Sequence, residues 1–428
     1  MADRILPSVS PAAVPGMPRD PSVDGTLDLM REGYTFIMDR CRQLGTDVFE
    51  TRLMLKPVVC MMGAAAARLF YEDTRFERAG AAPLRLQRTL FGRGGVQGLD
   101  GEAHHHRKAL FLSVLTPEGV GHLVDDVRSQ WLFQVPRWAR RDQVVLFDEV
   151  EEILCRAVCG WAGVPLPESD VARRTADLHA LIDSPGALGP RHWRGRMGRA
   201  RAERWMAKLV KDVRAHRLAI PDDSALARVA SHRDLDGQLL TPGIAAVEVL
   251  NLLRPTVAVA RWITFAALAL HEHGGQRERI ARGDDAEAER FAQEVRRYYP
   301  FFPFVAARVR QDFEWQGYTF RRGRRVLLDI YGTHHDPRSW ARPGAFRPDR
   351  FLDGGGDPYR FLPQGTGNLR TGHRCPGDEL ALELTRVCTQ LLVRSMRYTV
   401  PPQDLRVDLT RIPALPASGF VMRDVRAV

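Results

Sequence analysis

The sequence predicts a mostly helical protein with a small, discontinuous β region. Apolar residues recur at helical spacing over seven long stretches, at about 104–115, 118–140, 146–163, 167–183, 199–218, 241–273 and 286–299. Strand-like alternation is confined to short runs. We find neither an internal repeat nor a low-complexity linker, so most of the 428 residues are expected to form one unusually large unit.

The predicted elements begin after a loose N-terminal segment. Residues 1–23 combine several prolines with small residues and are expected to form a flexible arm, whereas residues 24–428 form the single folded domain. The pattern from Leu27 to about Leu44 is helical, and the alternation in Val48–Met61 predicts a hairpin of strands. Short strands are also predicted at Val305–Val309, Val326–Ile330 and Phe420–Val425.

The composition excludes several classes of function. Hydrophobic residues at 44% and charged residues at 27% are ordinary for a soluble globular protein, and no run of about 18 apolar residues could span a bilayer. The first residues lack the pattern of a secretory signal, so we expect a cytoplasmic protein. The net charge of +10 comes from arginines dispersed among acids, which argues against nucleic acid and favours anionic ligands. The six cysteines include no CxxC pair, so neither disulfides nor a structural zinc site is expected.

One cysteine lies between a glycine-rich loop and the start of a helix. The loop extends from Pro363 to Gly377 and contains Cys375, and an apolar helical pattern follows from Asp378 to about Met396. A thiolate there meets the positive end of the helix dipole, which is expected to lower its pKa and make it a metal ligand or a nucleophile. Because glycines let the backbone pass close to a flat group, the combination suggests a haem iron held by one thiolate.

Two further motifs accompany this loop. Glu294 and Arg297 share one face of a predicted helix, and Arg350 follows in the segment Phe346–Phe351. An ExxR helix, a PxRF segment and a Cys-x-Gly loop in this order resemble the cytochrome P-450 superfamily. The resemblance implies the cytochrome P-450 fold, with Cys375 as the axial ligand of haem b. It also implies that the glutamate and the two arginines form a buried salt-bridged triad that locks the loop.

The central helix departs from the usual pattern of that superfamily. Typical members carry an acid-threonine pair in its middle, which delivers protons to bound dioxygen, whereas this sequence has Arg254-Pro255. A proline inside a helix costs about 3 kcal/mol, so the break must be used or compensated. Arg254 needs an anion because a guanidinium stays charged on burial. An internal carboxylate, a haem propionate or a carboxylate brought by the substrate would each satisfy it.

The Arg-Pro pair resembles one branch of the superfamily, the bacterial fatty-acid peroxygenases, which use hydrogen peroxide in place of dioxygen and a reductase. Matching segments cover nearly the whole chain after the arm: Phe91-Gly92, 96–101, 104–108, 189–193, 294–300, 331–333 and 363–377. The resemblance implies that Arg254 and Pro255 are catalytic. The carboxylate of a long-chain fatty acid, salt-bridged to Arg254, would act as acid and base in peroxide cleavage. Hydroxylation at the α or β carbon is then expected, with no obligatory redox partner.

Gln97 lies where this branch carries either glutamine or histidine near the haem. Members with histidine lean toward oxidative decarboxylation to terminal alkenes, and glutamine is typical of hydroxylases. Because a neutral amide only hydrogen bonds, we favour hydroxylation, with decarboxylation as the alternative. A glutamine that faces solvent in a loop is the ordinary interpretation.

Two rival functions use the same haem-thiolate chemistry. A dioxygen-dependent monooxygenase with a redox partner lacks support because no acid-alcohol pair remains in the central helix. A non-catalytic haem sensor would leave a buried arginine and a broken helix without a purpose. Turnover with peroxide and fatty acid alone separates these possibilities.

The resemblance also implies residues around the haem and the alkyl chain. The three consecutive histidines 104–106 point in different directions on a helix and cannot converge on a metal ion. Haem propionates are expected to meet basic side chains chosen from Arg78, His104, Lys108 and Arg374. The alkyl-chain tunnel is expected to be lined by Leu90, Phe91, Phe301, Phe302 and Phe304, although such an aromatic cluster is equally typical of ordinary core.

Overall fold

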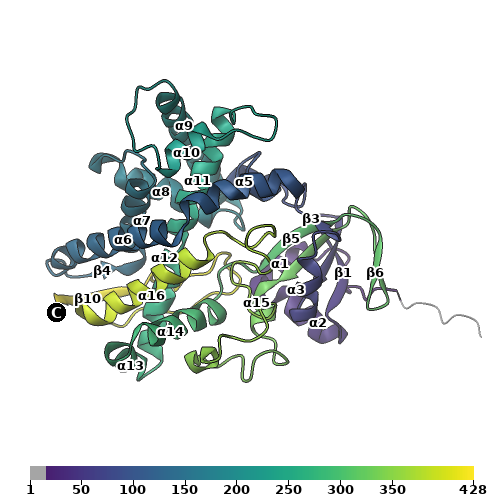
Figure 1. Cartoon of the computed structure of the whole chain (residues 1–428). Coiled ribbons are helices and arrows are strands. Elements are labelled where there is room, and N and C mark those ends of the chain that lie inside the picture. Colours follow the sequence, from purple (N-terminus) through teal and green to yellow (C-terminus); the bar gives the residue numbers. More distant parts are fainter. Residues whose placement is uncertain (1–15) are drawn as a thin grey trace, which may run out of the picture.

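A computed structural model describes residues 16–428 as a body of long helices beside a smaller β region (Figure 1). The predicted fold class is therefore confirmed. The helices are α1 (Thr26–Glu32), α2 (Phe36–Leu44), α3 (Ala64–Phe70), α4 (Leu84–Leu86), α5 (Gly101–Val114), α6 (Pro117–Trp138), α7 (Leu146–Trp161), α8 (Val171–Asp183), α9 (Gly189–Arg214), α10 (Ala225–Ser231), α11 (Pro242–Ala258), α12 (Ala260–Glu272), α13 (Gln276–Arg282), α14 (Asp285–Tyr298), α15 (Ile330–His334) and α16 (Asp378–Arg394).

The strands form a main sheet and two small ones. Their bounds are β1 (Val48–Leu53), β2 (Lys56–Met61), β3 (Phe76–Glu77), β4 (Val144–Val145), β5 (Phe304–Val309), β6 (Phe313–Trp315), β7 (Tyr318–Phe320), β8 (Arg325–Asp329), β9 (Met396–Thr399) and β10 (Val421–Ala427). The main sheet has the order β1-β2-β8-β5-β3, and the others are β4-β10-β9 and β6-β7. The predicted hairpin is confirmed, with Val48 opposite Met61, and β2 pairs in parallel with β8 from the other half of the chain.

The N-terminal arm is shorter than the sequence suggested. Residues 1–15 of the expected arm lie outside the described residues. The backbone N–H of Asp20 donates to the carbonyl of Glu50 at 2.8 Å, and the N–H of Glu50 donates to the carbonyl of Pro18 at 2.8 Å. The Asp20 carboxylate is buried, accepts a hydrogen bond from Thr51 at 2.8 Å and lies 3.7 Å from Arg40. The expectation that the arm includes residues 18–20 is therefore wrong, because these residues pair with the edge of β1.

The start of α9 also differs from the prediction. The helix begins at Gly189, ten residues before the predicted stretch, with Pro190 in its first turn. Glycines and arginines dominate residues 189–204, so no apolar periodicity marks this half of the helix. The helix is stabilised instead by packing along α8 and α11.

The central helix is almost continuous and lies in the largest hydrophobic core. Thr241 caps its start by accepting a hydrogen bond from Ile244 N–H at 3.3 Å, and the helix passes through Pro255 before one turn breaks at Val259. Pro255 has no N–H to donate to the carbonyl of Asn251. The stretch Pro242–Glu272 is long and apolar enough to cross a membrane, but 83% of its most apolar window is buried, as befits a core helix.

Candidate active site

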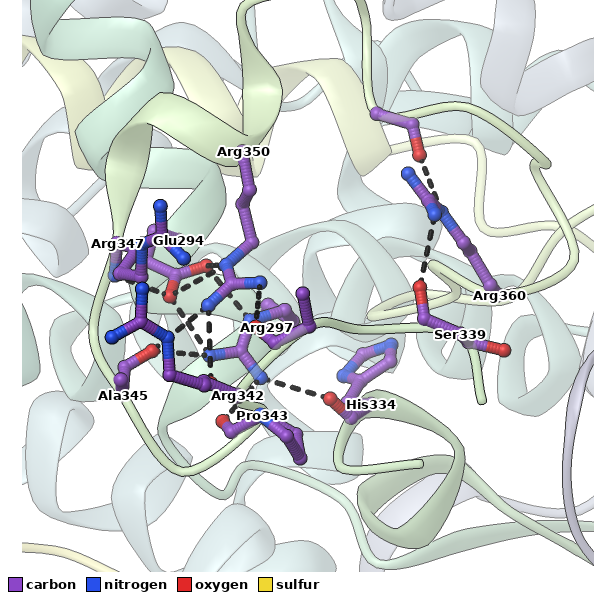
Figure 2. Close-up of polar contacts among 12 residues, drawn as sticks. Glu294, Arg297, His334, Ser339, Arg342, Pro343, Ala345, Arg347, Arg350 and Arg360 are labelled. Carbon is purple, nitrogen blue, oxygen red and sulfur yellow. Dashed lines mark hydrogen bonds and ion pairs between the residues drawn. The ribbon is translucent and has the colours of Figure 1, made fainter. Parts of the chain in front are cut away.

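The glutamate of the ExxR motif is the centre of a buried ion-pair cluster (Figure 2). Arg297 donates two hydrogen bonds to the Glu294 carboxylate, from Nε at 2.7 Å and from Nη2 at 2.8 Å, and both side chains are fully buried. Arg350 donates from Nε to the same carboxylate at 3.1 Å. Arg297 also donates to the carbonyls of His334 and Pro343 at 2.9 and 3.0 Å. The cluster thus ties α14 to the irregular segment that precedes the cysteine loop, with one carboxylate shared by two guanidiniums whose other N–H groups donate to backbone carbonyls.

A second arginine of α14 braces the cysteine loop itself. Arg296 donates to Gln364 Oε1 at 3.0 Å and pairs with Asp378 at the start of α16. The backbone carbonyl of Gln364 accepts from Cys375 N–H at 3.0 Å, and its side-chain Nε2 lies 3.5 Å from Cys375 Sγ. Arg296 was not among the residues predicted from the sequence, although its position inside the Glu-x-x-Arg motif places it on the same helix, one residue before Arg297.

Cys375 lies at the N-terminal end of α16, as predicted. Burial raises the pKa of the Cys375 thiol, while the Gly377 N–H, Gln364 and Lys108 act against that increase. The expectation of a lowered pKa is therefore wrong for the thiol without metal, because desolvation outweighs the nearby donors. A thiol held deprotonated only by a bound metal is typical of a ligand rather than of a free nucleophile.

Two of the four basic side chains expected to bind a propionate, Lys108 and Arg374, interact with protein groups instead. The buried ammonium of Lys108 donates to the carbonyls of Gly372 and Arg374, the latter at 2.7 Å. The guanidinium of Arg374 pairs with Asp378 at 2.6 Å. Both side chains therefore stabilise the cysteine loop. These contacts do not support the expectation that Lys108 and Arg374 bind a propionate.

The other two basic side chains differ from each other. His104 stacks on His373 with ring centroids 4.0 Å apart, and burial lowers its pKa to about 3, so the ring is neutral. Arg78 lies over the rings of Phe70 and Tyr71 at 4.3 and 5.5 Å, and among the residues from 16 onward it has no carboxylate within ion-pair distance. Burial lowers the pKa of Arg78. A buried cation over aromatic rings, next to a loop that presents a thiol, fits an anionic haem.

Arg254 is buried in the middle of the central helix. Its Nη1 donates to the backbone carbonyl of Leu90, and no carboxylate of the described part of the chain pairs with it. Arg199 from α9 donates to the same carbonyl at 3.1 Å and is itself paired with Glu203 at 2.6 Å. Burial and the charge of Arg199 lower the pKa of Arg254 to about 9, so the guanidinium is still charged at neutral pH. The hypothesis that an internal carboxylate pairs with Arg254 is therefore wrong.

Gln97 contacts the helix that carries this arginine and does not lie in an open loop. It is half-buried, and its Oε1 accepts a hydrogen bond from Asn251 Nδ2 at 3.2 Å. Asn251 precedes Arg254 by three residues on α11, so the amide and the guanidinium share one face of the helix. The interpretation of Gln97 as a solvent-facing loop residue is wrong.

The expected tunnel residues divide into three groups. Leu90 and Phe91 adjoin the two arginines, since their carbonyls accept the hydrogen bonds of Arg199. Phe301 packs on Trp262 with ring centroids 4.3 Å apart, and Phe301 and Phe302 line a cavity of about 10 Å³, the space of a single water. Phe304 begins strand β5 and packs against the hydrophobic cluster between α2 and the main sheet, which includes Phe36 and Phe49. Its assignment to the tunnel is therefore wrong.

Known proteins share both the motifs and this geometry. A family model described as cytochrome P-450 matches residues 288–423. A putative cytochrome P-450 120 from Synechocystis sp. (strain ATCC 27184 / PCC 6803 / Kazusa) is 25% identical over 420 residues, covering 92% of each chain. The solved structure of cytochrome P-450SP alpha (CYP152B1) in complex with (R)-ibuprophen is 49% identical, with a TM-score of 0.92, and the match covers 94% of this chain and 99% of that one. This chain belongs to the cytochrome P-450 family.

Two other solved structures of this cytochrome P-450 family indicate the branch. Cytochrome P-450EX alpha (CYP152N1) with myristic acid is 42% identical over 96% of this chain and 99% of that one, with a TM-score of 0.93. A variant of cytochrome P-450 OleT in complex with arachidonic acid is 34% identical over 97% and 99%, with a TM-score of 0.94. The chain is a haem-thiolate oxidoreductase of the fatty-acid peroxygenase branch, as predicted. The roles of individual residues stay predictions.

Proposed function

We propose that this cytochrome P-450 hydroxylates long-chain fatty acids at the α or β carbon with hydrogen peroxide as the oxidant and haem b as the cofactor. No redox partner is required. The observation that carries the proposal is the buried guanidinium of Arg254, which has only the Leu90 carbonyl as its partner in the described chain. A charged group in that environment calls for an anion, and a fatty-acid carboxylate matches its bidentate geometry.

Substrate binding exchanges one partner of Arg254 for another. The carboxylate takes the place of the Leu90 carbonyl on the guanidinium. Arg199 keeps its hydrogen bond to that carbonyl, so the 90–91 backbone stays in position. The pKa of Arg254 is lowered by burial and by Arg199, and Cys375 acts against that decrease, so the guanidinium and the sulfur are close enough to interact. A carboxylate bound to Arg254 is therefore proposed to hold the carbons next to it near the reacting centre.

The bound carboxylate also replaces the acid that the helix lacks. It accepts a proton from one oxygen of hydrogen peroxide and returns that proton to the other oxygen, which leaves as water. Haem bound through Cys375 supplies the iron centre at which the peroxide oxygen is activated for insertion into a C–H bond. Gln97 offers an amide without a titratable proton, so it orients groups by hydrogen bonds and transfers no proton. Hydroxylation is accordingly favoured over decarboxylation.

The test uses the purified, haem-loaded protein with myristic or palmitic acid and hydrogen peroxide, without any reductase. Hydroxy acids identified by mass spectrometry are the expected product, and their ratio to terminal alkenes measures the competing decarboxylation. Product formation that requires a reductase and dioxygen would instead establish a monooxygenase. Haem loading without any product under either condition would indicate a binding protein.

A further inference from the structure

A chain of buried polar side chains runs from Gln97 through α11 to α5. Glu248 on α11 is fully buried, and its Oε1 accepts a hydrogen bond from Arg107 Nη1 at 2.7 Å. Its Oε2 accepts from Asn251 Nδ2 at 2.8 Å. The same Nδ2 donates to Gln97 Oε1 at 3.2 Å. One carboxylate therefore connects a buried arginine to the two amides beside Arg254.

The carboxylate fixes which way both amides point. An ionised Glu248 only accepts hydrogen bonds, so Asn251 must turn its NH₂ group toward it. That group has two N–H bonds, and the second one meets the oxygen of Gln97. Gln97 consequently presents its own NH₂ group away from Asn251. The Oδ1 atom of Asn251 is buried and has no hydrogen-bond partner within the described residues.

Arg107 keeps Glu248 in the state that this arrangement needs. Burial raises the pKa of Glu248, and the hydrogen bonds from Asn251 and Arg107 act against that rise. Arg107 is buried as well and is held from the other side by Asp234, with Nη2 2.7 Å from Oδ2. The ion pair is thus clamped at a distance from the reacting centre and acts through Asn251.

We propose that Glu248 is a positioning residue that orients Asn251 and Gln97 to bind hydrogen peroxide. A peroxide O–H donates to Asn251 Oδ1, and the Gln97 NH₂ group donates to a peroxide oxygen. The inference rests on the proposed function, because it assigns the place of that reaction's oxidant.

The chemistry of the two amide groups selects the ligand. The fatty-acid carboxylate has no hydrogen to donate to Asn251 Oδ1, whereas hydrogen peroxide both donates and accepts. Asn251 and Arg254 are about one helical turn apart, so the peroxide and the carboxylate that exchanges a proton with it lie next to each other. Gly95 borders the pair, since a Cβ atom there would lie 3.0 Å from Gln97 Oε1 and 3.1 Å from Asn251 Nδ2. Position 95 therefore has no room for a side chain beside the two amides.

The first test compares Glu248→Gln and Asn251→Ala with the unchanged protein. Loss of one hydrogen bond to the oxidant is expected to raise the KM for peroxide about tenfold in each variant. The fatty-acid dissociation constant, measured by the shift of the haem absorption band, is expected to stay within about twofold. Glu152→Gln, which removes a partly exposed ion pair with Arg156 (3.3 Å) on α7, is the matched control and is expected to change neither. An unchanged KM for peroxide in Asn251→Ala would overturn the proposal. Because Asn251→Ala leaves the buried Arg107–Glu248 ion pair intact, it provides the test even if Glu248→Gln does not fold.

A double-variant cycle tests whether Glu248 acts through its neighbours. Because Glu248 reaches Gln97 only through Asn251, Glu248→Gln combined with Asn251→Ala is expected to raise the KM for peroxide no more than Asn251→Ala alone, and additive effects would overturn the proposed route. The unfolding midpoints in urea of Glu248→Gln, Asn251→Ala and their combination give a readout without catalysis. The combination is expected to be no less stable than the weaker single variant. Failure of the unchanged protein to form product with peroxide would instead contradict the proposed function.

Discussion

Replacing Arg254 with methionine tests the anchor of the substrate directly. Methionine keeps much of the side-chain volume and removes the charge, so packing against the Leu90 segment is largely retained. In the free protein the guanidinium is buried beside another cation, Arg199, and its pKa is lowered to about 9. Its removal therefore relieves an unfavourable charge, and Arg254→Met is expected to bind haem and to unfold at no lower temperature than the unchanged protein.

The effect on fatty-acid binding has the opposite sign. Deleting one partner of a buried ion pair leaves the other charge uncompensated, which costs about 3–5 kcal/mol. At about 1.4 kcal/mol per factor of ten, the dissociation constant of myristic acid is expected to rise about 100-fold to 4000-fold. Arg254→Lys keeps the charge and loses the bidentate fork, so a smaller increase of about tenfold is expected.

The assay is a titration with myristic acid, followed by the haem absorption band, together with the rate of product formation from peroxide. Product from Arg254→Met is expected to fall at least as far as the affinity, because the carboxylate is also the missing acid-base group. An affinity and a product rate within a factor of ten of the unchanged protein, with haem fully bound, would refute the reasoning.

Three further perturbations follow from the same structure. Glu294→Gln leaves two buried arginines without a carboxylate and is expected to lower the free energy of unfolding in urea by about 3–5 kcal/mol, with loss of haem; an unchanged free energy would contradict the role of the cluster. Burial raises the pKa of Asp329 from 3.8 to about 8, so the stability that the protonated carboxyl contributes is fully present below about pH 4 and is lost as the pH rises to 8. The thermal stability of Asp329→Asn relative to the unchanged protein is therefore expected to increase between pH 4 and pH 8, and a pH-independent difference would refute this. Gly92 has φ +83° and a Cβ there would collide with Arg199, so Gly92→Ala should weaken fatty-acid binding, whereas Gly98→Ala, with open space around it, should not; equal affinities would be evidence against this loop.

The parts of the site that the sequence predicted are those encoded by short spacings. Glu294 and Arg297 are three residues apart on one helix, so their pairing follows from helix geometry alone. The loop around Cys375 and the Arg254-Pro255 pair are likewise local departures from ordinary patterns. A proline inside an apolar helix is unfavourable, and glycines before a lone cysteine are unusual. Each therefore indicates a special structural role from the sequence alone.

The parts that the sequence did not predict depend on contacts between distant segments. Arg107 and Glu248 are 141 positions apart, and Gln97 and Asn251 are 154 apart, so no spacing rule connects them. Lys108 was expected to meet a propionate because it is basic and near the haem in the resemblance. Its actual acceptors, the carbonyls of the cysteine loop, are set by how α5 packs on that loop. Charge alone does not reveal which anion or dipole a buried cation meets.

The buried arginines of this protein differ in which group compensates their charge. This difference supports the proposal that Arg254 binds the substrate. Arg297 and Arg107 each hold a buried carboxylate of the same chain and are structural by that criterion. Arg261 is fully buried and makes no hydrogen bond within residues 16–428, yet the carboxylates of Asp183 and Glu151 lie 3.6 and 3.9 Å away and balance its charge. The strongest charge acting on Arg254 from the protein is that of another cation, Arg199. An arginine buried without a carboxylate and next to a second cation is stabilised when an anion binds, and in the proposed function that anion is the carboxylate of the substrate.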